Sequence, residues 1–185
     1  MRARILSIAI MLVLLSACAS GVGHLADLPK DTDKPYLLGA GDTLQIVVFG
    51  ETDLSGPVRI ADNGTVTMPL IGSIPAQGMT VNQLQQELVK RLDANAVKSP
   101  NVTVTISEYR PFFILGEVKN PGSYPYMPNM TVLTAVAIAG GFTPRASQDS
   151  ISVTRQYSGK PYELRAQRGA RVQPGDTVYV FERHF

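Results

Sequence analysis

The sequence is poor in the residues that build most metal and redox centres. Among its 185 residues there are one cysteine, two histidines and no tryptophan. A single cysteine excludes an intrachain disulfide and a multi-cysteine metal site. His24 and His184 lie at opposite ends of the chain, so with Cys18 they cannot supply the three or four ligands that zinc takes. We therefore expect no metal and no cofactor.

The familiar catalytic motifs are missing as well. The chain has no Gly-x-Ser-x-Gly elbow, no phosphate-binding Gly-x-x-x-x-Gly-Lys-Ser/Thr loop and no dinucleotide fingerprint. Asp42 and Asp176 are the one pair of carboxylates in matching contexts, each within a Gly-Asp-Thr sequence. Paired carboxylates hydrolyse glycosidic bonds, but an aspartate in a turn also caps backbone amides. We predict that both aspartates cap backbone amides in turns and that the protein is not an enzyme. A glycan hydrolase that uses this pair is the weaker alternative.

Long apolar runs are limited to one, Ile5–Leu15, which follows Arg2 and Arg4. Eleven helical residues extend about 16 Å, against roughly 30 Å of hydrocarbon, so this run suits a signal peptide and not a membrane span. It ends in Leu-Ser-Ala-Cys18, which resembles the lipobox of bacterial lipoproteins. That resemblance implies cleavage before Cys18 and lipidation of Cys18. An ordinary signal peptide with a chance cysteine is the alternative.

A lipid anchor would hold the mature chain to a membrane without a transmembrane helix, because more than one acyl chain gives stable anchoring. Residue 19 is alanine and not the aspartate that retains many such lipoproteins in the inner membrane. By resemblance, the protein is expected in the outer membrane, facing the periplasm.

Excess charge of either sign is also lacking. Removal of residues 1–17 takes two of the 17 basic residues and none of the 15 acidic ones, which leaves 15 of each. Arg165, Arg168 and Arg171 cluster, but Glu163 and Asp176 flank them, so we interpret them as a solvated face. The basic stripe of a nucleic-acid binder is not present.

The first half of the mature chain has the pattern of a small α+β unit. After a Gly- and Pro-rich tether, residues 44–49 form a predicted strand, and Asp62-Asn63-Gly64 predicts a hairpin between residues 58–61 and 65–70. Thr80 and Gln83 form a capping box for an amphipathic helix. Apolar residues then alternate with Thr and Ser in a strand at 102–107.

The second half repeats this design around residues 110–144. A predicted strand at 112–118 leads through an Asn-Pro-Gly turn into a returning strand. A helix at 132–139 begins at Thr131, ends at Gly140-Gly141, and is apolar on every side, which predicts burial all round. A hairpin at 150–166 follows, and the last strand, 177–182, is expected to return to the first lobe.

Aromatic residues are concentrated in one region. They are Tyr109, Phe112, Phe113, Tyr124 and Tyr126. Aromatic faces stack on sugar rings and also fill protein cores. Both a glycan contact and core packing are consistent with this concentration.

The run Phe-Ile-Leu-Gly-Glu-Val-Lys-Asn-Pro-Gly at 113–122, with Met-Thr-Val and a small-residue helix ending Ala-Gly-Gly, resembles the SLBB domain, a ligand-binding relative of the β-grasp fold. The preceding segment resembles the N-terminal domain of bacterial polysaccharide export proteins of the Wza and GumB type. The expected fold class is α+β, in two small lobes. The expected divisions are a signal peptide (1–17), a tether (18–35), an export domain (36–109), an SLBB domain (110–166) and a C-terminal strand (167–185).

The resemblance implies a periplasmic component of a capsule or exopolysaccharide export machine. Copies would assemble into a ring through which the polymer passes, with an inner-membrane co-polymerase or chain-length regulator as partner. Long relatives end in an amphipathic helix that forms the outer-membrane pore, and this chain has no room for one, so a separate outer-membrane β-barrel is a further expected partner. The alternative is a monomeric, lipid-tethered module that binds a glycan or small ligand. Ligand-binding residues are not predicted.

Overall fold

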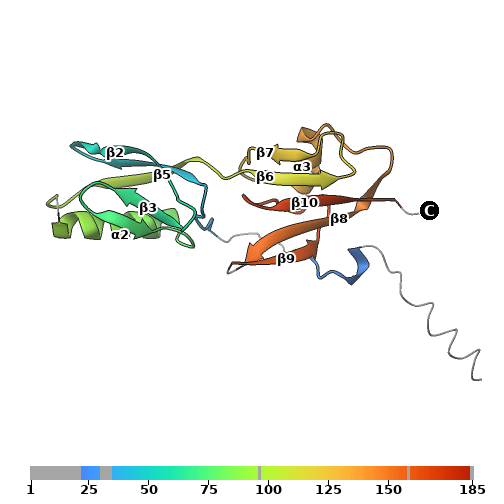
Figure 1. The fold of residues 1–185 in the computed structure, drawn as a ribbon, viewed down its shortest axis with the longest axis horizontal. Helices are drawn as coiled ribbons and strands as arrows, with labels where there is room; N and C mark the ends of the chain where they lie inside the picture. The colour runs from blue at the N-terminus through green and yellow to red at the C-terminus, as the bar shows by residue number, and fades with distance from the viewer. Residues whose placement is uncertain (1–21, 30–34, 96, 158, 184–185) are drawn as a thin grey trace, which may run out of the picture.

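Two α+β lobes lie end to end along the long axis of the molecule (Figure 1). The structure is a computed structural model that describes residues 22–29, 35–95, 97–157 and 159–183. Lobe one comprises residues 36–109, and lobe two comprises residues 110–183. Each lobe has its own buried apolar cluster, so the α+β class and the division of the core into two parts are confirmed.

Lobe one is built on a three-stranded antiparallel sheet with the order β2-β1-β5. Its strands are β1 (Thr43–Val48), β2 (Glu51–Arg59) and β5 (Val102–Glu108). Alternate side chains of β1 and β5 are buried, while the intervening residues, Thr103 and Thr105 among them, lie on the open face. This alternation follows from the two-residue period of a strand.

Helix α2 (Val81–Asn95) covers the buried face of that sheet. Leu84, Leu88 and Leu92 recur at helical spacing and are fully buried in the core of lobe one. The predicted capping box is confirmed: the Thr80 backbone N–H donates to Gln83 Oε1 over 2.8 Å, and the Gln83 N–H donates to Thr80 Oγ1 over 3.2 Å.

The predicted pairing of residues 58–61 with 65–70 is wrong. Strand β2 pairs with β1, whereas β3 (Thr65–Met68) pairs with β4 (Gly72–Pro75). The turn at Gly64 does form, with φ of +78°, but the chain turns again at once through Leu70 (φ +68°) and Gly72 (φ +69°). Because this second tight turn directly follows β3, strand β4 folds back beside β3 and takes the place predicted for residues 58–61.

Lobe two contains a five-stranded sheet with the order β7-β6-β10-β8-β9. Helix α3 (Val132–Ile138) lies in the same buried cluster as this sheet. The strands are β6 (Phe112–Gly116), β7 (Gly122–Tyr124), β8 (Ala146–Tyr157), β9 (Lys160–Arg165) and β10 (Thr177–Glu182). The β6–β7 and β8–β9 hairpins were both predicted from turn residues, and both are present.

The sequence predicted that the last strand returns to lobe one, and this prediction is wrong. Strand β10 is the central strand of lobe two, parallel to β6 and antiparallel to β8. Val178 and Val180 are fully buried there, opposite Ile114, Val153 and Ile151. Because β10 is buried between two partners, it completes the core of lobe two. The Gly-Asp-Thr sequence that precedes both β1 and β10 does not show which lobe the last strand joins.

Helix α3 also differs from its prediction. Thr131 caps it through a hydrogen bond from the Thr134 N–H, and Gly140 and Gly141 end it with φ of +85° and +92°, as expected. However, Leu133 is 50% exposed and Ile138 is 36% exposed, so only one side of the helix is buried. The helix lies on one face of the sheet, and none of the described residues forms a second layer above it.

The described part of the N-terminal tether is not free. Residues 22–28, which we call the strap, begin with the short helix η1 (Val22–His24) and contact β8 and β9 of lobe two. Leu28 is buried in the core of lobe two, although residues 36–109 separate it from that lobe in the sequence. The expectation of a simple spacer is therefore wrong for these residues, although His24 within them is exposed.

Candidate functional site

The residues with the most buried polar chemistry lie at the junction between the lobes. Asp42 is fully buried and accepts four hydrogen bonds. Its donors are the Tyr36 hydroxyl (2.6 Å), the Gly39 N–H (2.9 Å), the Arg110 N–H (2.9 Å) and Arg110 Nη1 (3.1 Å). A buried carboxylate is stabilised when charged and neutral donors satisfy it in this way.

Arg110 connects this carboxylate to lobe two. Its Nε donates to the carbonyl oxygen of Pro174 over 3.1 Å. Gly39 and Gly175 leave room for the guanidinium in this position, because a Cβ on Gly39 would lie 2.1 Å from Arg110 Nη1 and a Cβ on Gly175 would lie 2.7 Å from Arg110 Nε. One arginine side chain thus lies between turns of both lobes.

Asp176, in the second Gly-Asp-Thr sequence, repeats the arrangement. It is 1% exposed, accepts the Gln173 N–H over 2.7 Å, and pairs with Arg155 through Nε (3.0 Å) and Nη2 (2.8 Å). Burial raises the pKa of the Asp176 carboxyl, and its hydrogen bonds to Arg155 oppose that shift. Both aspartates accept the N–H three residues before them, which is the predicted turn role.

The arrangement of these two carboxylates does not resemble a hydrolytic pair. Each oxygen of both side chains already accepts a hydrogen bond from the protein. A glycosidase needs carboxyl groups that flank the bond to be cleaved. The geometry assigns Asp42 and Asp176 to the support of the fold.

The aromatic concentration serves mainly as packing. Phe112 is fully buried and stacks with Tyr124, with ring centroids 6.0 Å apart. Tyr109 makes edge contacts with Tyr36 of lobe one (5.2 Å) and Tyr126 of lobe two (5.3 Å), so these rings cross the junction. Phe113 alone among the five residues is a large exposed apolar side chain, at 43%.

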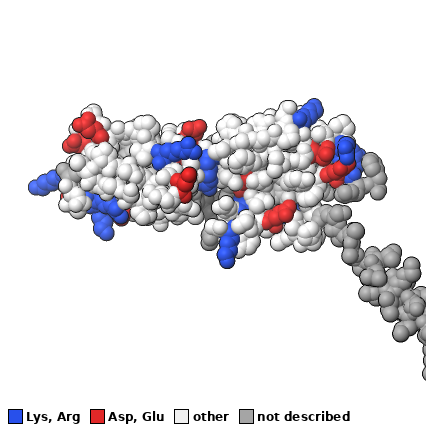
Figure 2. Space-filling view, viewed as in Figure 1, with Lys and Arg blue, Asp and Glu red and all other residues white. Residues whose placement is uncertain are grey.

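The open face of the lobe-two sheet is apolar over its central strands. Phe113 and Leu115 of β6 and Tyr179 of β10 are each more than 40% exposed, and Tyr179 lies opposite Leu115 in the parallel register. Phe181 contacts the Tyr179 ring edge-on at 4.7 Å. We call these four residues the apolar patch. Figure 2 shows a broad uncharged area over β6 and β10.

The open face of lobe one has a different character. Thr43, Gln45, Thr103 and Thr105 share it, because β1 pairs with β5 in a register that places Gln45 opposite Thr105. Val47, which is 44% exposed and lies opposite Thr103, and Arg59, which lies opposite Thr43, belong to the same face. A shallow hollow of about 410 Å³ lies elsewhere on lobe one, lined by Gln83, Gln86, Glu87, Lys90 and neighbouring Gly78 and Met79. The sequence did not predict this hollow. One side is formed by Gly78 and Met79, and the other by side chains of α2.

The other sites and segments discussed from the sequence have the following outcomes. Within the described residues, no group of three or more His, Cys, Asp or Glu side chains is placed to hold a metal ion. The helices of those ranges are too short or too polar to cross a membrane. Cys18 lies outside the described residues, so its lipidation stays a prediction. In the arginine cluster, Arg165 pairs with Asp27 and Arg168 with Asp149.

Comparison with known proteins covers both lobes. The family model described as polysaccharide biosynthesis/export protein matches residues 30–107, and the SLBB domain model matches residues 111–166. The chain belongs to the polysaccharide biosynthesis/export protein family. The two matches follow one another in the order of the two lobes, and β10 lies beyond the second match.

Curated relatives are named for the production, export or transport of polysaccharides. The chain is 33% identical over 150 residues to the exopolysaccharide production protein ExoF of Rhizobium meliloti (strain 1021), a match that covers 75% of this chain and 34% of that protein. It is 32% identical over 158 residues to the EPS I polysaccharide export outer membrane protein EpsA of Ralstonia solanacearum, covering 70% and 41%. The polysialic acid transport protein KpsD of Escherichia coli is 23% identical over 148 residues, covering 79% and 24%. The chain therefore spans well under half the length of the relatives it matches.

Proposed function

We propose that the protein is a component of a capsule or exopolysaccharide export machine, anchored by lipid at Cys18 to the outer membrane and facing the periplasm. Several copies assemble into part of a conduit for the polymer. The protein acts as a structural component and not as an enzyme. Its partners are further copies of itself, the exported polysaccharide, and an inner-membrane co-polymerase or chain-length regulator. A separate outer-membrane β-barrel completes the path across the outer leaflet.

The observation that carries this proposal is the apolar patch of lobe two, within a family whose relatives are named for export. Three large apolar side chains of adjacent strands, each more than 40% exposed, form one continuous surface. Contiguous exposed apolar surface usually marks an interaction site. In an assembly, a second copy of the chain would cover this surface.

The polar face of lobe one supports the conduit role. Thr103 and Thr105 are exposed, and Thr43 and Gln45 lie beside them on the adjacent strand. Hydroxyl and amide groups exchange weak hydrogen bonds with hydrated sugars, and one cation, Arg59, lies at the junction end of this face, opposite Thr43. A surface of this kind suits the passage of a polysaccharide.

The first experiment measures secreted polysaccharide in a deletion strain that is complemented with different forms of the gene. The wild-type gene is expected to restore secretion, and Cys18→Ser and Phe113→Arg are expected to restore much less. Leu133→Arg is the matched control, because Leu133 is an exposed apolar residue of the same lobe that lies outside the patch. Secretion that is unchanged by the deletion, in a strain with no second copy of the gene, would overturn the export role.

A second measurement separates the conduit from the alternative of a monomeric, lipid-tethered binding module. Native mass spectrometry of the detergent-extracted lipoprotein is expected to show an oligomer for the wild type and for Leu133→Arg, and a monomer for Phe113→Arg. A monomeric wild-type protein that still binds glycan oligosaccharides would favour the binding module.

A further inference from the structure

The open face of lobe one ends at the junction in an arginine whose charge the fold does not use. Arg59 is the last residue of β2, it is exposed, and it lies opposite Thr43 of β1. Within the part of the chain that the structure describes, its guanidinium takes part in no ion pair and no hydrogen bond. A cation that no protein group neutralises is available to an anionic ligand.

The neighbouring Arg110 differs from Arg59 in this respect. A Cβ added at Gly41 would lie 3.8 Å from Arg59 Nη2 and 3.4 Å from the Arg110 Cβ, so both arginines border the same turn. The Arg110 guanidinium pairs with the buried Asp42 carboxylate over 3.1 Å. Because Asp42 neutralises Arg110, the positive charge that remains at this end of the open face belongs to Arg59.

Uncharged and acidic hydrogen-bonding groups lie beside this cation. Thr43 lies between Arg59 on β2 and Glu108 on β5. Neighbouring strands are about 4.8 Å apart, so the Cα atoms of Arg59 and Glu108 are roughly 10 Å apart, which leaves room for a sugar ring between the two side chains. Gln45, two residues further along β1, lies on the same face. Hydroxyl, amide and carboxylate groups all form hydrogen bonds with sugar hydroxyls.

We propose that these four side chains form a subsite for an acidic sugar residue, with the sugar carboxylate on Arg59 and its hydroxyl groups on Thr43, Gln45 and Glu108. The proposal rests on the proposed function, in which the polymer passes along this face. Arginine binds a carboxylate through two parallel N–H donors. In water a single pair of this kind is weak, so it favours acidic polymers without holding the chain in place. The substrate class is thus a carboxylate-bearing polysaccharide.

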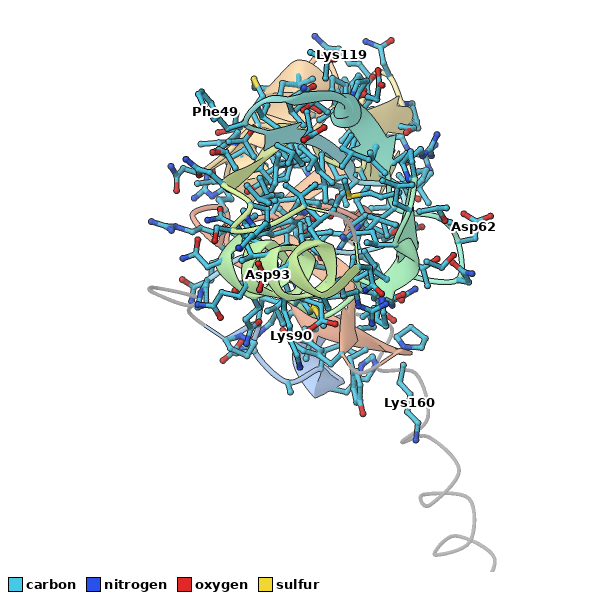
Figure 3. All side chains as sticks on the ribbon, turned by 90° about the vertical axis from the view of Figure 1, so that its left-hand side faces the viewer. Phe49, Asp62, Lys90, Asp93, Lys119 and Lys160 are labelled. Atoms are coloured by element: carbon cyan, nitrogen blue, oxygen red, sulfur yellow. The ribbon has the colours of Figure 1, made fainter. Side chains whose placement is uncertain are left out.

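Lys90 of α2 provides a matched control for Arg59. It is exposed, it lies in the wall of the shallow hollow of lobe one, and its removal changes the charge of the lobe by the same amount. Figure 3, which views the molecule from the end of lobe one, shows Lys90 and Asp93 on the opposite side of the lobe from Phe49 and the β1–β2 turn. Because α2 covers the buried face of the sheet, Lys90 lies away from the open face.

The test is a calorimetric titration of the mature chain with two probes that share one backbone. The first is a short oligomer of galacturonic acid, and the second is its methyl ester, which has no charge. The acid is expected to bind about fivefold more tightly than the ester. Arg59→Gln should abolish this preference, whereas Lys90→Gln should retain it. Unchanged urea midpoints show that both variants are folded.

A second variant separates recognition of the charge from recognition of the hydroxyl groups. Gln45→Ala is expected to weaken the acid and the ester by the same factor, because it removes a contact to the sugar and not to the carboxylate. Equal binding of acid and ester by the wild type, or no binding of the acid, would overturn the proposal. Loss of the preference in Lys90→Gln and not in Arg59→Gln would assign the acidic sugar to the hollow and overturn it as well.

Acidic sugars occur both in secreted polymers and in the cell wall, so the final arm compares polysaccharide purified from the medium with cell-wall muropeptides. Binding of the secreted polymer that depends on Arg59 is the expected result, and binding of muropeptides alone would overturn the proposal. The secretion assay of the deletion strain decides the export role separately. Lost secretion in that strain, together with equal binding of acid and ester, would leave the export role standing and remove only the subsite.

Discussion

The Nη1 atom of Arg110 donates to the buried Oδ2 atom of Asp42 over 3.1 Å, across 68 residues of sequence, and the same guanidinium donates from Nε to Pro174 of the other lobe. Asp42 is fully buried, whereas the Arg110 side chain is 29% exposed. The pair thus lies at the boundary between the core and the solvent, and it connects a turn of lobe one with a turn of lobe two. This arginine therefore contributes, beside the rings of Tyr36, Tyr109 and Tyr126, to the contact between the lobes.

Replacement of Arg110 by methionine keeps an unbranched side chain like the arginine stem and removes the side-chain donors. The Asp42 carboxylate would keep the Tyr36 and backbone donors but lose its charged partner, so we expect the free energy of unfolding to fall by about 2 kcal/mol. Urea unfolding measures this change. Arg91→Met is the control, since Arg91 forms a surface pair with Glu87 within α2 and should have a far smaller effect. Equal losses from both variants would contradict the role of Arg110.

Gly39→Ala tests the fit around the guanidinium. Its Cβ would lie 2.1 Å from Arg110 Nη1, which is closer than atoms approach, so the arginine must move away from Asp42. We expect destabilisation of about 1–3 kcal/mol. A double-mutant cycle with Arg110→Met should show that the two losses are not additive, because both remove the same interaction. Gly169→Ala, where a Cβ meets nothing within 4 Å, should be close to neutral.

Local features of the fold could be predicted from the sequence because their causes are local. The capping box at Thr80, the glycines that end α3 and the alternation in β5 each involve residues a few positions apart. The turn roles of Asp42 and Asp176 belong to this group, since each bonds an amide three residues earlier.

Relationships between distant segments could not be predicted. Strand β10 could have paired with either lobe, because a buried apolar strand suits any sheet with a free position. Arg110 and Arg155 carry no motif, and their partners lie 68 and 21 residues away. Leu28 stands in a segment rich in Gly, Asp and Pro, and only the tertiary structure shows that its side chain enters the core of lobe two.

Thr80→Ala tests the capping box of α2. Loss of the hydroxyl removes the acceptor for the Gln83 N–H, so we expect the free energy of unfolding to fall by about 1 kcal/mol. Thermal unfolding followed by circular dichroism measures the change. Thr103→Ala, on the exposed face of β5, controls for loss of a threonine outside a cap. A cap role would be contradicted if Thr80→Ser, which keeps the acceptor, were as unstable as Thr80→Ala.

Tyr36→Phe tests the junction at alkaline pH. Burial and the hydrogen bond to Asp42 raise the pKa of the Tyr36 hydroxyl well above its usual value near 10. A raised pKa means that the folded state holds the proton more tightly than the unfolded chain does. The stability linked to this proton is fully present below about pH 10 and is lost as the pH rises above it.

Wild-type protein is therefore expected to lose stability between about pH 10 and pH 12, as unfolded chains release a proton that the folded state retains. Tyr36→Phe should be less stable at pH 7, because Asp42 loses one donor, and should lose less on going to pH 12. Urea midpoints across this range measure both effects. Tyr162→Phe, in which an exposed tyrosine of β9 is replaced, should retain the wild-type pH dependence. If Tyr36→Phe and the wild type declined in parallel above pH 10, the Tyr36 hydroxyl would not be the group responsible.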